Sequence, residues 1–145
     1  MRVAAPSRAS PRAAAAELFE RAAQLTPPAH TPEGARRRME AARCAFQSGD
    51  TSRARELLDE VHRVTDRGSD RARPLIHMAL VRGYDDDLRA AESLLGEAIE
   101  NADGDAELRA DAHLQLGGIL FRLRERLREA VEDSTAGAAS ARVDL

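Results

Sequence analysis

Residues 88–102, which read LRAAESLLGEAIENA, contain the clearest helical pattern in the chain. Their apolar residues recur three and four positions apart and therefore fall on one side of a helix. These residues are Leu88, Ala91, Leu94, Leu95, Ala98, Ile99 and Ala102. A similar pattern surrounds Ala54, 37 residues before Ala91, and Ala130, 39 residues after it. Repeats of this length, built from helix pairs with small residues at their crossing points, are typical of an α-solenoid.

Turn and capping signals divide the rest of the chain in the same way, into seven antiparallel helices or about three helix pairs. The helices are expected from Arg12 to Leu25, from Thr31 to the stop at Gly49, from Asp50 or Thr51 to the stop at Gly68, from Asp70 to Arg82, from Leu88 to Ala102, from the break at Gly104 through Leu123, and from about Glu125 into Ala136–Ser140. Thr31 is expected as an N-cap with Pro32 at the first helical position. The fold class predicted is therefore an all-α, tetratricopeptide-like solenoid.

Proline and glycine inside two of these helices need a packing explanation. Pro74 is expected in the first turn of its helix, because proline cannot continue the hydrogen-bond ladder further in. Gly117 and Gly118 lie in mid-helix, where each costs about 1 kcal/mol relative to alanine. Close approach of a neighbouring helix would explain them, and an intrinsically poor helix is the alternative.

Length and composition limit the class of protein. The 145 residues fit one domain, which we expect over residues 12–134, between a disordered Arg/Pro/Ser leader at 1–11 and a flexible tail at 135–145. The net charge of -3 argues against direct binding to DNA. A single cysteine excludes an internal disulfide, and no apolar run approaches the roughly 20 residues that span a bilayer. The leader lacks the apolar stretch of a secretory signal, so a cytoplasmic protein is expected.

Several polar features were weighed as sites of chemistry. The acidic corner Asp85–Asp87 has the oxygen ligands of a hard-cation site, but carboxylates before a helix more often cap it. His77 and His113 are expected to be ordinary semi-buried histidines, and Cys44 a small core residue. The arginines at 36–38 and 122–128 alternate with glutamates at helical spacing, which favours solvated, ion-paired faces over phosphate contacts.

Catalytic and nucleotide-binding motifs are absent from the sequence. A phosphate loop of the Walker type needs a lysine, and all 22 basic residues are arginine. Neither the dinucleotide-binding glycine pattern nor a nucleophile elbow occurs. We therefore expect no enzyme activity and no cofactor.

Several segments of the chain carry a family resemblance when they are taken in order, namely Arg21–Pro27, Ala41–Arg43, Gly49–Thr51, Ala54–Leu58, Val81–Leu88 and Leu114–Arg124. Together they resemble the helical-repeat region of large LuxR-family transcriptional regulators, the MalT-like, ATP-binding kind common in actinobacteria. The resemblance covers roughly residues 12–133. It implies a sensor superhelix that controls assembly, without the ATPase of the STAND type and without the helix-turn-helix of such regulators. We expect a truncated or stand-alone piece of one.

The function predicted is a non-catalytic module that binds a protein or small-molecule effector on a concave face. Solenoid geometry places that face on the first helix of each pair. Its expected residues are Met39, Arg43, Ile76, Leu80 and Leu116. The repeat ends lack an obvious polar cap, which favours a homodimer through them. The alternatives are a free-standing adaptor for protein–protein interaction and a decayed gene remnant; contact with a membrane is not expected.

Overall fold

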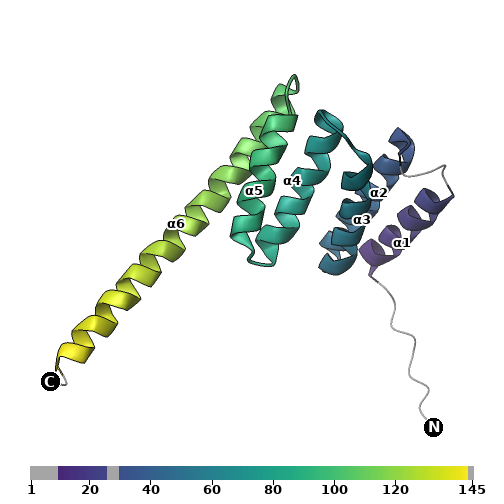
Figure 1. Cartoon of the computed structure of the whole chain (residues 1–145). Helices are drawn as coiled ribbons and strands as arrows, with labels where there is room; N and C mark the ends of the chain where they lie inside the picture. Colours follow the sequence, from purple (N-terminus) through teal and green to yellow (C-terminus); the bar gives the residue numbers. More distant parts are fainter. Residues whose placement is uncertain (1–9, 26–29, 144–145) are drawn as a thin grey trace, which may run out of the picture.

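The computed structural model describes residues 10–25 and 30–143, and within these ranges all regular secondary structure is helical (Figure 1). Its six helices are α1 (Pro11–Gln24), α2 (Pro32–Gln47), α3 (Thr51–Val64), α4 (Ser69–Tyr84), α5 (Leu88–Asn101) and α6 (Ala106–Val143). The prediction of an all-α chain is confirmed, whereas the expected number of seven helices is wrong. All but the last two residues of the expected leader, 1–11, lie outside the described residues.

Local capping signals set the starts of three helices as the sequence predicts. The Thr31 hydroxyl accepts a hydrogen bond from the Gly34 amide at 3.1 Å, with Pro32 as the first residue of α2. Asp50 accepts from the Arg53 amide at 3.0 Å and Asp87 from the Ala90 amide at 3.3 Å. Each side chain satisfies an amide that has no partner inside its helix, so these starts are determined by neighbouring residues alone.

Each helix packs against the next one in the chain, and α4 also contacts α2 and α6. Two buried clusters result, one among α1, α2 and α3 with Val81, and one among α4, α5 and α6. Alanines line the helix crossings in both clusters. Those with no exposed surface are Ala41, Ala54, Ala72, Ala91, Ala98, Ala102 and Ala112. Small side chains let helix axes approach closely, so the aromatic-poor composition is compatible with close packing.

Helix α6 has no break at the position where the sequence analysis ended one helix and began another. Arginine, leucine, glutamate and alanine around residue 125 are all good helix formers, and no proline interrupts them. Arg128 also pairs with Glu125 at 2.8 Å along the same helix face, which supports continuation. The helix therefore runs past the rest of the molecule, and residues 135–143 of the expected tail belong to it (Figure 1).

Three smaller expectations are also corrected. α3 ends at Val64, and Gly68, with φ +72°, instead precedes α4. Pro74 is the sixth residue of α4 and so lies in its second turn. No atom lies within 4 Å of a Cβ added at Gly117 or Gly118, so close helix approach does not explain them.

The close approach lies at Gly83 instead. A Cβ there would be 3.1 Å from Cδ1 of Ile119, and the Gly83 carbonyl accepts a hydrogen bond from Arg122 at 3.0 Å. Gly83 therefore sets the distance between the end of α4 and the middle of α6.

Candidate ligand-binding groove

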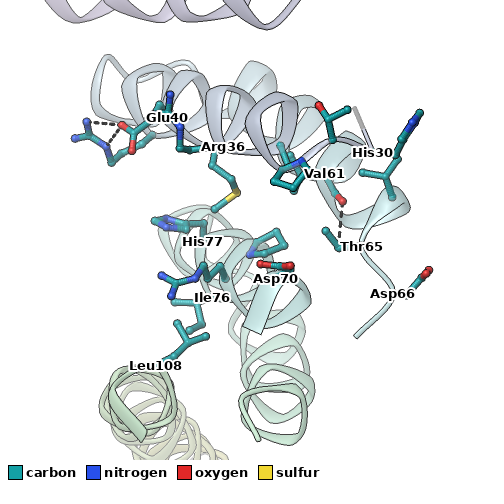
Figure 2. A pocket seen from close by; sticks show the side chains of 18 of the residues that line it. His30, Arg36, Glu40, Val61, Thr65, Asp66, Asp70, Ile76, His77 and Leu108 are labelled. Carbon is teal, nitrogen blue, oxygen red and sulfur yellow. Dashed lines mark hydrogen bonds and ion pairs between the residues drawn. The ribbon is translucent and has the colours of Figure 1, made fainter. Parts of the chain in front are cut away.

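A groove of about 800 Å³ lies over α2, α4 and α6 (Figure 2). α2 forms one wall, α4 the floor, and the start of α6 the other wall, while the end of α3 and the α3–α4 connection close one end. Its volume is within the range that accommodates a small molecule or a short peptide segment.

Helical spacing brings the lining side chains to one side of each helix. Ala35, Met39 and Arg43 follow one another four residues apart on α2, and Pro74 and His77 lie three apart on α4. Figure 2 shows His77 and Ile76 facing the space between α2 and Leu108 of α6. The apolar lining consists of Pro32, Ala35, Met39, Val61, Val64, Pro74, Ile76 and Leu108.

Ion pairs border this apolar lining. Arg36 donates two hydrogen bonds to Glu33, at 2.8 and 3.0 Å, and Arg43 donates two to Glu40, at 2.8 and 3.1 Å. Arg73 is 3.4 Å from Asp105. The hydrogen bonds from Arg36, and then from Arg37, lower the pKa of the Glu33 carboxyl to about 2. The Glu33 carboxyl is therefore ionised at neutral pH and pairs with the guanidinium groups of Arg36 and Arg37.

The α3–α4 connection and the first turn of α4 supply charges of a different kind. The side chains of Asp66, Arg67 and Asp70 line the groove, and among the described residues none of them has a hydrogen-bonding or ion-pairing partner. Such side chains reorient at little cost, because no existing bond has to be broken. This end of the groove is suited to pairing with a polar or charged part of a ligand.

His77 is the titratable group in the middle of the groove. Burial lowers the pKa of its imidazole below 6.5, an effect that Arg43 and Arg73 reinforce and that Asp111 and Glu40 oppose. The ring is therefore neutral at pH 7. Within the described part of the chain no group hydrogen-bonds to it, so one ring nitrogen is available to donate and the other to accept.

The structure brings together three of the five residues expected on the binding face. Met39, Arg43 and Ile76 line the groove. Leu80 is 40% exposed on α4 and does not line it, and Leu116 packs half-buried against the α4–α5–α6 cluster. Four further residues line the groove but were not expected on this face: His30, Asp66, Arg67 and His77. The first three lie outside the helices, where periodicity gives no signal.

The other polar features have structural partners. Asp85 pairs with Arg55, Asp86 pairs with Arg122 and Arg126, and Asp87 caps α5. The capping interpretation of the acidic corner is thus confirmed for its last residue.

The cysteine has the structural role expected of it, whereas the first arginine run pairs at helical spacing only at Arg36 and Arg37, with Glu33. Cys44 is buried in the α1–α2–α3 cluster, as predicted. Arg38 pairs with Glu60 at 2.9 Å, which joins α2 to α3. The expectation of a semi-buried His113 is wrong, because this side chain is exposed and borders a smaller depression at the start of α6.

Residues 10–25 and 30–143 contain no group of His, Cys, Asp or Glu side chains that could hold a metal ion. Nor does any helix in these ranges have a stretch long and apolar enough to cross a bilayer. No protein-family model, no curated protein and no solved structure matches this chain. The groove and its side chains are therefore the basis on which a function can be argued.

Proposed function

We propose that the chain is a cytoplasmic, non-catalytic helical-repeat module that binds a peptide or small-molecule effector in the groove over α2, α4 and α6. In this proposal α2–α3 and α4–α5 are successive helix pairs, and α6 begins the next pair of a tetratricopeptide-like solenoid. The contacts of α4 with both α2 and α6 support this, because first helices of neighbouring pairs touch in such a solenoid.

The observation that carries the proposal is the groove itself. It takes its lining from α2, α4 and α6, together with the end of α3 and the connections before α2 and α4. An apolar floor bordered by charges buries the body of a ligand and orients its polar ends. The resemblance to the sensor region of LuxR-family regulators adds that the bound effector controls assembly, with DNA contacted by other parts of such a regulator.

Two matched arginines test the site. Arg43 on α2 lines the groove and pairs with Glu40 three residues away, at 2.8 Å. Arg89 on α5 lies outside it and pairs with Glu92 three residues away, at 3.0 Å. Both are exposed, so Arg43→Glu and Arg89→Glu impose the same charge reversal inside and outside the groove.

The probes are a random peptide library selected on the immobilised chain and a metabolite collection screened by thermal shift. Titration calorimetry then compares the selected ligand on the wild type and both variants. We expect Arg43→Glu to weaken binding by roughly tenfold or more and Arg89→Glu to leave it within about twofold. Equal affinities for the two variants, or no ligand from either screen, would overturn the proposal.

A further inference from the structure

An exposed apolar stripe runs along α6 beyond the body of the molecule. Leu120, Leu127 and Val131 are 46%, 60% and 62% exposed. With the half-buried Leu116 and Leu123 they are three or four residues apart, which places all five on one helix face. A soluble helix normally covers such a face.

The stripe continues a packed surface of the same helix. Leu116 and Leu123 pack against the α4–α5–α6 cluster, in which Ile119 is buried. The C-terminal half of the helix projects beyond α4 and α5 (Figure 1), and from Arg124 to Ser140 every residue except half-buried Glu125 is exposed. Nothing in the described part of the chain covers Leu127 or Val131.

The charges beside the stripe change sign just after Leu127. Residues 122–128 contain four arginines and one glutamate. Residues 129–133 contain Glu129, Glu132 and Asp133 and no basic residue. When two copies of this segment lie antiparallel, the basic part of each faces the acidic part of the other, whereas a parallel arrangement places like charges together. A twofold interface requires this kind of self-complementarity.

We propose that two copies of the chain associate by antiparallel packing of residues 120–134 of α6, with Leu127 of each copy near the twofold axis. The helix length supports this, because this segment extends about 22 Å at 1.5 Å per residue and gives an overlap of about four turns.

Sedimentation velocity on the full chain over a range of concentrations tests the interface. We expect a dimer whose dissociation constant Leu127→Glu raises at least about 100-fold, because the twofold axis brings two copies of the substitution into one interface. Leu114→Glu is the control, since Leu114 is 77% exposed on the same helix but lies away from the stripe. Circular dichroism checks that both variants stay folded. A chain that is monomeric at all concentrations, or a dimer that resists Leu127→Glu, would overturn the proposal.

Disulfide trapping under mild oxidation tests the orientation, because the native Cys44 is buried. Leu127→Cys is expected to cross-link to itself. Ser134→Cys is expected to cross-link only to a Leu120→Cys chain, which the antiparallel register places opposite it. Self-cross-linking of Ser134→Cys would indicate parallel helices and would contradict the proposed arrangement.

Discussion

The two halves of α6 have the same helical periodicity but differ in what covers their apolar face. In the first half, Leu108, Ala112 and Ile119 are at most 9% exposed against α4 and α5. In the second half, Leu127 and Val131 are at least 60% exposed. The exposure of the two halves differs because α6 extends beyond α4 and α5, which cover only its first half (Figure 1). A hydrophobic repeat therefore specifies a face, while the lengths of neighbouring helices decide whether that face is covered within the chain.

The largest difference in stability is expected between the truncation of a covered leucine and the truncation of an uncovered one. Leu95→Ala opens a cavity among α4, α5 and α6, because Leu95 is only 1% exposed, and should cost about 2–5 kcal/mol. Leu127→Ala should change the stability of the monomer by no more than about 0.5 kcal/mol. Denaturant unfolding at low protein concentration measures both. Similar losses for the two variants would contradict the distinction between covered and uncovered leucines.

Two glycines give the next comparison, one in a close contact between helices and one with open space around it. Gly83→Val places methyl groups into the contact with Ile119 and should cost about 1–3 kcal/mol. Gly118→Ala meets no atom within 4 Å and should stabilise the chain by about 1 kcal/mol through helix propensity. Thermal unfolding decides both signs. A neutral Gly83→Val would mean that α4 and α6 are less closely packed than described.

The groove contains a desolvated histidine, His77, which should make the stability of the fold depend on pH. Because the pKa of His77 is lowered in the fold, the unfolded chain takes up the proton first as pH falls below 6.5. The contribution of His77 is therefore neutral above pH 6.5 and destabilising below it. Melting temperatures at pH 7.5 and pH 5.5 should differ less in His77→Gln than in the wild type. His113→Gln, at an exposed position, should keep the wild-type difference.

The smallest effect is expected at the ion pairs that join the corner after α4 to α6. Asp86 contacts Arg122 and Arg126 and has a φ of +69°, which asparagine also tolerates. Asp86→Asn removes the charge at a position that is about half exposed, and should cost at most about 1 kcal/mol. The loss should shrink as salt is added, since salt screens exposed pairs. A salt-independent loss would mean that the backbone conformation, and not the charge, is what the substitution disturbs.

The sequence predicts the parts of this fold that depend on neighbouring residues. Thr31, Asp50 and Asp87 cap helices where the sequence places them, because a cap involves only the next three residues. The continuity of α6 was missed, because a new helix was expected from about Glu125 although the residues around this position are good helix formers.

The groove could be predicted only in part, and for a similar reason. Met39, Arg43 and Ile76 were found from their positions on first helices of the expected pairs. Asp66 and Arg67 were not found, since the path of the α3–α4 connection is set by tertiary packing and carries no periodic signal.

Amide hydrogen exchange along α6, measured at low and at high protein concentration, tests the central comparison most directly. At low concentration we expect strong protection around residues 108–123, where α4 and α5 cover the helix, and weak protection beyond residue 127. At high concentration protection should appear beyond residue 127 as a second copy covers the stripe. Uniform protection along α6 in the dilute chain would contradict the account.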